Sequence, residues 1–149
     1  MERIRPARAE DAVRLAEIEI ACYRRYFYPI FRTDRYFFSE LNVPVLIEEY
    51  RKEPERVAHT FVYDDGIVKG FVRVNGAEIE KLFVEPAFQN GGAGSALLAH
   101  AIAAGGTRLL VLEKNPDAIR LYERHGFRAT GERQRVDDTP EYLLRMELS

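Results

Sequence analysis

The sequence predicts one α/β (α+β) domain over residues 1–149, with helices on both faces of a mixed, mostly antiparallel sheet of six to seven strands. Three observations predict it. The length of 149 residues is typical of a single core. Strand patterns separated by the turn signals Asp64-Asp65-Gly66 and Asn75-Gly76 indicate an antiparallel meander in the middle of the chain. About four helical patterns flank that meander, two before it and two after it.

The first third of the chain predicts one strand and two helices. Arg3 to Ala7 forms a short strand, and apolar residues at helical spacing predict a helix over Ala9–Arg25 that ends before Pro29. An aromatic-rich stretch, Tyr26–Phe38, comes next. Ser39 then caps a second helix, bent at Pro44, that ends at Pro54.

The remaining two thirds predict six strands and two helices. A glycine-rich loop opens the first of these helices, over Ser95–Ala104, and Asn115-Pro116 begins the second, which ends before Gly126. The predicted strands are His59–Tyr63, Ile67–Val74, Glu78–Val84, Arg108–Leu112, Phe127–Val136 and Tyr142–Leu148.

Composition narrows the class of protein. The formal net charge of -2 gives no reason to expect nucleic acid or an anionic membrane as a partner. Cys22 is the single cysteine, the charged start lacks a signal-peptide pattern, and the longest apolar run, residues 96–104, is too short for a bilayer. We therefore expect a soluble, cytoplasmic protein. Metal is not expected, because ligand spacing is missing from the three histidines, His59, His100 and His125.

The loop Gln89–Gly94 carries the first chemical signal. Glycines at a helix N-terminus expose backbone N–H groups that suit a phosphate or pyrophosphate, although a plain tight turn is also open. A dinucleotide-binding loop is the competing interpretation, since Glu113 follows Gly92-Ala93-Gly94 by about 20 residues. Leu97 stands where that fingerprint needs its third glycine, which argues against it.

Two motifs resemble one family. Gln89-x-x-Gly92-x-Gly94 follows Val84-Glu85-Pro86, and Asn115-x-x-Ala118-x-x-Leu121-Tyr122-x-x-x-Gly126-Phe127 lies downstream in the expected order. Both patterns resemble those of the GNAT superfamily of N-acetyltransferases, and the resemblance covers nearly the whole chain.

The resemblance implies that acetyl-CoA is the acyl donor and that it binds where strand Glu78–Val84 splays from strand Arg108–Leu112. Tyr122 would be the general acid for the departing thiolate, unless it is simply a core residue. One of the N–H groups of Leu82, Phe83 and Val84, with Val84 as the first candidate, would stabilise the oxyanion. Backbone groups of Leu82, Phe83 and Val84 would pair with the pantetheine arm, and Asn115 would contact the arm or the adenosine end. Pyrophosphate would bind the amides of Asn90, Gly91, Gly92, Ala93, Gly94 and Ser95, with Gln89 opening the loop.

An amine acceptor must lose a proton before it attacks, and a carboxylate is the common base. Glu78 and Glu80 share one strand and point to one side, so both are candidates; each can equally be a solvated charge or pair with Lys81 or an arginine.

The acceptor is expected to be a primary amine of a small molecule or peptide, attacked directly in a ternary complex. Aromatic residues in Tyr26–Phe38 form either an acceptor pocket with basic groups or ordinary core packing. The alternative function is an inactive CoA-binding module of the same fold, and a homodimer is possible. The basic residues in question are Arg24, Arg25, Arg32 and Arg35.

Overall fold

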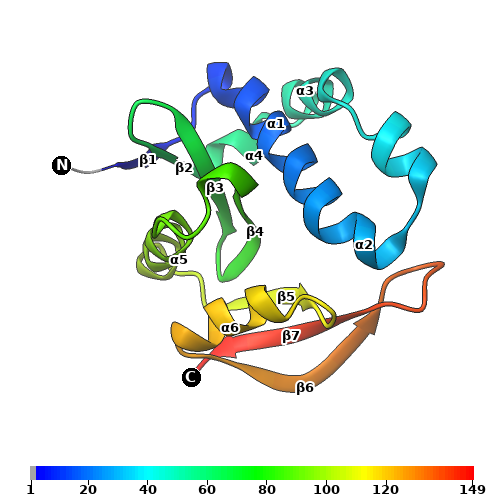
Figure 1. The fold of residues 1–149 in the computed structure, drawn as a ribbon. Coiled ribbons are helices and arrows are strands. Elements are labelled where there is room, and N and C mark those ends of the chain that lie inside the picture. Colours follow the sequence, from blue (N-terminus) through cyan, green and yellow to red (C-terminus); the bar gives the residue numbers. More distant parts are fainter. Residues whose placement is uncertain (1–2) are drawn as a thin grey trace.

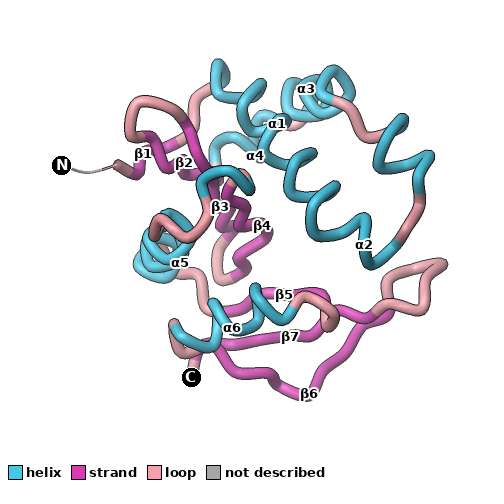
Figure 2. Tube along the Cα trace, in the orientation of Figure 1, coloured by secondary structure: helices cyan, strands magenta, loops and turns pink. Residues whose placement is uncertain are grey.

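The computed structural model describes residues 3–149, whose seven strands form one sheet in the order β1-β2-β3-β4-β5-β7-β6 (Figures 1 and 2). All neighbouring strands are antiparallel except β4 and β5, which are parallel. The predicted fold class is confirmed. The strands are β1 (Ile4–Pro6), β2 (Thr60–Asp64), β3 (Val68–Asn75), β4 (Glu78–Val84), β5 (Arg108–Leu112), β6 (Phe127–Arg135) and β7 (Tyr142–Leu148).

Helices cover both faces of the sheet. The described residues form six α-helices: α1 (Ala12–Cys22), α2 (Tyr28–Phe31), α3 (Val43–Lys52), α4 (Pro54–Ala58), α5 (Ala93–Ala103) and α6 (Pro116–Arg124). Alternation along β3 explains the two layers, because Phe71 packs in the cluster with α1 whereas Val72 packs in the cluster with α5. Figure 1 shows α1 to α4 gathered on one side and α5 on the other.

Two segments differ from the sequence-based expectation. The helix expected from Ser39 to Pro54 begins at Val43, and its N-cap is Asn42, whose side chain accepts from the Val45 N–H at 3.0 Å. Pro44 lies in the first turn of α3, where a backbone N–H would have no acceptor within the helix. Pro44 therefore does not bend the helix. A five-residue π-helical stretch, Tyr23–Phe27, continues α1 into α2.

The feature that positions the site is a bulge in β4. Arg73 pairs with Lys81 and Val74 pairs with Ile79, which leaves Glu80 as an extra residue with no partner on β3. A bulge bends its strand and increases the local twist. Pairing between β4 and β5 covers only Glu78 and Ile79 and stops immediately before that bulge. The two parallel strands therefore diverge from Glu80 onward, as the resemblance to the GNAT superfamily implied.

Candidate active site

Beyond the bulge, β4 turns toward β5 backbone groups that are not paired with another strand. In an antiparallel pair the N–H and C=O of one residue point to the same side, and successive residues alternate. The Glu85 N–H donates to the Lys69 carbonyl of β3 at 2.9 Å, so the backbone groups of Phe83 also point to β3. Those of Leu82 and Val84 consequently point into the gap. A contact from Phe83 to a ligand in the gap would have to come from its side chain.

The opposite wall of the gap follows the same rule. The Glu113 N–H donates to the Tyr142 carbonyl at 2.9 Å, which places alternate residues of β5 against β7. The backbone groups of Leu110 and Leu112 face the gap instead. The gap is therefore lined on both sides by strand backbone that can pair with an extended ligand.

The mouth of the gap lies at the N-terminus of α5. Gly92 is the N-cap in a left-handed conformation (φ 88°) with no side-chain cap, and Asn90 also has a positive φ of 67°. The Ala96 N–H makes the first bond of the helix, to the Gly92 carbonyl at 3.0 Å. The preceding N–H groups, of Ala93, Gly94 and Ser95, have no acceptor within the helix and carry the positive end of its dipole. This turn can accept an anion.

Gln89 ties the loop to both neighbours. Its Nε2 donates to the Val84 carbonyl at 2.9 Å, and its Oε1 accepts from the Tyr26 hydroxyl. The Cys22 thiol donates to the same Val84 carbonyl at 3.2 Å. Burial raises the pKa of Cys22 to about 12, so this thiol is not a nucleophile near neutral pH. The side chain of Gln89 is thus a bridge between β4 and the π-helical stretch.

Tyr122 lies on α6 in the main hydrophobic cluster and is 9 % exposed. Its ring meets Phe127 edge-on, with centroids 6.1 Å apart, and burial raises the pKa of its hydroxyl to about 12. That hydroxyl bonds no described residue. Every fully enclosed side-chain polar atom among residues 3–149 has a partner, so the Tyr122 oxygen must keep some accessible surface. It is a protonated donor that no described residue engages.

The helix carrying Tyr122 borders the mouth of the gap. A Cβ added to Gly94 would lie 3.7 Å from Leu121 and 3.8 Å from Val84, so the start of α5, the end of β4 and α6 meet there. Asn115 lies across the gap at the end of β5, where its N–H donates to the Leu112 carbonyl at 3.0 Å. Its side chain caps α6 by accepting from the Ala118 N–H at 3.4 Å.

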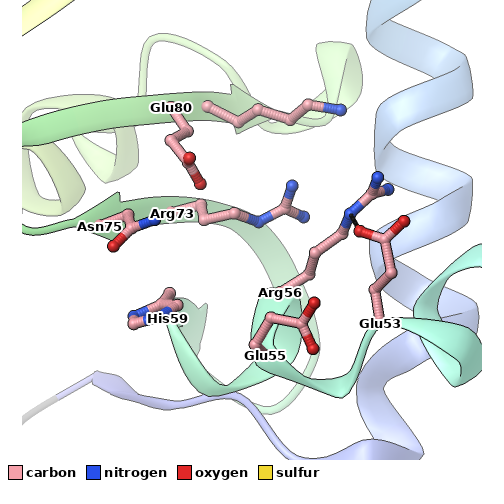
Figure 3. A pocket seen from close by; sticks show the side chains of 8 residues that line it. Glu53, Glu55, Arg56, His59, Arg73, Asn75 and Glu80 are labelled. Atoms are coloured by element: carbon pink, nitrogen blue, oxygen red, sulfur yellow. Dashed lines mark ion pairs between the residues drawn. The ribbon is translucent and has the colours of Figure 1, made fainter.

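The two candidate bases have different surroundings. Glu78 lies where β4 and β5 are still paired, and its carboxylate accepts from Arg108 at 3.1 Å and from Arg145 at 2.9 Å. Glu80 is the bulge residue, is exposed, and forms no ion pair with any residue from 3 to 149. It lines a polar pocket together with Arg73 (Figure 3), and Lys81 also lies in the wall of that pocket. Of the two, only Glu80 has a free carboxylate next to the gap.

Sequence reasoning missed a buried ionic cluster between α1 and the sheet. Glu19 is 2 % exposed and accepts from the Tyr50 hydroxyl at 2.8 Å and from Lys81 Nζ at 3.0 Å. Lys81 Nζ also donates to the Tyr23 hydroxyl at 2.8 Å. The available signal was a glutamate between Ile18 and Ile20 on the buried side of a helix, because a buried charge needs a partner.

The aromatic stretch packs largely on itself. The ring of Tyr28 meets that of Phe37 edge-on with centroids 5.8 Å apart, and the ring of Phe31 stacks on Phe37 with centroids 6.4 Å apart. The three rings belong to a hydrophobic cluster that includes Leu46. Three of the arginines bond to nearby residues of the same segment. Arg24 donates to the Phe37 carbonyl and Arg32 to the Pro29 carbonyl, and Arg35 forms an ion pair with Glu40. These contacts favour packing over an acceptor pocket for Tyr28, Phe31 and Phe37, whereas Tyr36 and Phe38 are exposed.

A gap of this kind takes an extended ligand along its strand backbone and an anion at its mouth, as expected for an acyltransferase that uses a CoA thioester. Comparison with known proteins identifies the class further. The GNAT acetyltransferase domain model matches residues 56–129. Peptidyl-lysine N-acetyltransferase YjaB of Salmonella typhimurium LT2 is 33% identical over 103 residues, which are 62% of this chain and 70% of YjaB. This chain belongs to the GNAT family and is an acetyl-CoA-dependent N-acetyltransferase.

Solved structures agree on the fold. An N-acetyltransferase from Staphylococcus aureus Mu50 superposes with a TM-score of 0.78 at 14% identity, covering 97% of this chain and 99% of its own. YncA from Salmonella typhimurium, solved with acetyl-CoA, superposes with a TM-score of 0.70 at 20% identity, and the match covers 98% of this chain and 92% of YncA. Within residues 3–149, neither a group of residues suited to a metal ion nor a helix able to span a membrane is found.

Proposed function

We propose that this protein transfers the acetyl group of acetyl-CoA to a primary amine by direct attack within a ternary complex. One observation supports this most strongly: the backbone groups of Leu82 and Val84 face a gap that opens at the Glu80 bulge and ends at an uncapped helix N-terminus. Residues 1–149 act in this proposal as a single domain, which the one continuous sheet supports. A cytoplasmic location and a homodimer stay predictions.

The donor would bind through backbone groups. The amides of residues 90–95 would take the pyrophosphate, since no lysine or arginine lies in that loop to do so. Leu82 and Val84 would pair with the pantetheine arm as an added strand. The Val84 N–H remains our candidate for polarising the thioester carbonyl, and the Leu82 N–H is the alternative because it lies two residues closer to Glu80. Asn115 would contact the donor from the end of β5.

Proton transfer would use one carboxylate and one phenol. Glu80 would accept a proton from the ammonium of the acceptor, because its carboxylate is unpaired, whereas Glu78 is held by two arginines. The free amine then attacks the thioester carbon, and a tetrahedral oxyanion forms. When the C–S bond breaks, Tyr122 would donate its proton to the CoA thiolate. A covalent acyl-cysteine is not expected, because the thiol of Cys22 is buried and protonated.

The acceptor would be an amine of a peptide or a small molecule. Support for a peptide comes from the name of the relative YjaB, a peptidyl-lysine N-acetyltransferase, and of its homologue in Escherichia coli K12, which is 31% identical over 103 residues.

The test is acetyl-CoA binding by calorimetry, followed by CoA release with a lysine peptide, an N-terminal peptide amine and a polyamine. Binding and turnover that are both lost when Gly92 and Gly94 are replaced together support the proposal. Tight binding with no turnover of any amine would instead favour an inactive CoA-binding module. No binding at all would reject both.

A further inference from the structure

A polar pocket of about 440 Å³ lies beside the bulge of β4. Its eight lining side chains come from α4 and its two cap residues, from the second half of β3 and from the middle of β4. Figure 3 shows Glu80 and Arg73 on the two adjacent strands facing the same space. The size is within the range of small-ligand sites. None of the roles assigned above to the donor uses this pocket.

The cations in its wall already have anionic neighbours. Arg56 pairs with Glu53 at 2.6 Å, and Lys81 pairs with Glu19 at 3.0 Å, with Arg73 3.9 Å from the same Glu19 carboxylate. Arg56 is therefore paired with a carboxylate of its own, whereas Lys81 and Arg73 share the single carboxylate of Glu19.

Two carboxylates in the wall have no such neighbour. Among residues 3–149, neither Glu55 nor Glu80 lies within ion-pair distance of a basic group, and both side chains are exposed. The pocket therefore offers two unpaired carboxylates to a ligand that carries an ammonium group.

Arg73 supplies a second and independent signal. It is 4 % exposed; its Nε donates to the Thr60 hydroxyl at 3.3 Å and its Nη2 to the Tyr50 hydroxyl at 3.0 Å. Its Nη1 donates to no described residue. Since every enclosed side-chain polar atom of residues 3–149 has a partner, Nη1 must keep accessible surface, and the pocket is the space that Arg73 lines. A nearly buried guanidinium with an open donor suits a carbonyl or carboxylate oxygen.

The pocket adjoins the vertex of the gap. Glu80 lies in its wall and is also the residue at which β4 parts from β5, about 4.8 Å away across the sheet. An amine that meets Glu80 from this pocket lies about 7 Å along β4 from Leu82, the nearer of the two N–H groups that would polarise the donor's thioester carbonyl.

We propose that this pocket is the acceptor subsite and that it selects amines carrying a carbonyl or carboxylate, that is, amino acid or peptide amines. Arg73 Nη1 donates to the oxygen, Glu80 faces the ammonium, and Glu55 at the rim attracts the cation. The inference rests on the proposed acetyl transfer only for the role of Glu80 as base.

The first test compares two ligands that share a carbon chain. Nα-acetyl-lysine N-methylamide carries the carbonyl groups, whereas cadaverine lacks them. Titrations of the CoA-saturated protein followed by NMR should give at least about tenfold tighter binding for the lysine derivative, the effect of one hydrogen bond to a charged group. The largest shifts are expected at the amides of His59 and Asn75. Equal affinities, or shifts confined to another surface, overturn the inference.

The second test changes the rim. Glu55→Lys should raise the KM for the lysine derivative by about tenfold and leave the KM for acetyl-CoA unchanged. The matched control, Glu10→Lys, reverses an exposed charge whose one ion-pair partner among residues 3–149 is Arg8, and it should change neither constant. An unchanged acceptor KM in Glu55→Lys overturns the inference.

A third variant addresses the guanidinium itself. Arg73→Lys keeps the charge and should reduce the preference for the lysine derivative over cadaverine. If Arg73→Lys does not fold, the two tests above still confirm or overturn the inference, because neither of them changes a buried residue. Failure of acetyl-CoA to bind would reject the proposed function, whereas acetyl-CoA binding without discrimination between the two ligands would reject the pocket alone.

Discussion

At the scale of single residues, the proposed role of Tyr122 as general acid can be tested without disturbing the core, although its side chain is buried. Tyr122→Phe removes one hydroxyl and leaves the ring packed on Phe127, so the fold should persist. We expect kcat to fall by about 10²-fold or more, the usual effect of losing a general acid, with the KM for acetyl-CoA little changed. Because its pKa is about 12, ionisation of Tyr122 should not reduce the wild-type rate below pH 10. An unchanged kcat in the variant would show that Tyr122 is only a core residue.

Glu78 and Glu80 offer a matched pair of substitutions on one strand. Glu80→Gln should lower kcat by about 10²-fold, because the ammonium of the acceptor loses its base. Glu78→Gln should keep kcat within about threefold and cost less than about 1 kcal/mol of unfolding free energy, because its pairs with Arg108 and Arg145 are partly exposed. Steady-state kinetics and denaturant unfolding of both variants measure this. The reverse pattern would assign the base to Glu78.

The Cys22 thiol gives a prediction for stability at alkaline pH. Its folded pKa, about 12, is above the ordinary value of 9.0, so between these values the folded state holds a proton that the unfolded state releases. The free energy of unfolding should therefore fall as the pH rises from 9 toward 12. Cys22→Ser keeps a donor for the Val84 carbonyl but removes the thiol that titrates. The free energy of unfolding of this variant should therefore fall less between pH 9 and pH 12. Parallel curves for both proteins, from denaturant unfolding at each pH, would contradict this.

At the scale of elements, local signals predicted much of the fold. The turn at Asn75-Gly76 and the strands on either side follow from residue type alone. Other features depend on distant partners. The bulge at Glu80 exists only in the register of β4 against β3, and the role of Asn42 as a cap was hidden because Ser39 is an equally good cap residue in the sequence. The pocket around Arg73 could not be predicted, because α4 and β3 meet only in the folded chain.

The glycine loop allows a test with a control one residue away. Gly92 has a φ of 88°, and an added Cβ would meet nothing within 4 Å, so Gly92→Ala is strained by its backbone alone. We expect a loss of about 1 kcal/mol in unfolding free energy and weaker acetyl-CoA binding, since the start of α5 shifts. Gly91 has no positive φ, and its nearest neighbour would be the Phe88 carbonyl at 3.7 Å. Gly91→Ala should change unfolding little; equal losses in both variants would exclude backbone strain as the cause.

At the scale of the whole molecule, the sheet consists of two parts that meet along a short seam. Strands β1 to β4 form one part and β5 to β7 the other, and only two residue pairs join β4 to β5. A hydrophobic cluster that includes Val84, Leu109 and Tyr122 spans both parts and keeps them together. A ligand bound along the seam would add hydrogen bonds to both sides, so it should stabilise the molecule by mass action and hold the two parts in one arrangement.

Amide hydrogen exchange tests this arrangement residue by residue. In the free protein the Leu82 and Val84 amides face the gap and should exchange faster than Phe83, which bonds β3. Acetyl-CoA should slow exchange at Leu82 and Val84 by about tenfold or more and leave Phe83 nearly unchanged. ADP has the diphosphate without the pantetheine arm, so it should protect the amides of residues 90–95 alone. Equal protection at Leu82 and Phe83 would mean that the arm does not bind as an added strand, because strand pairing can reach only alternate residues.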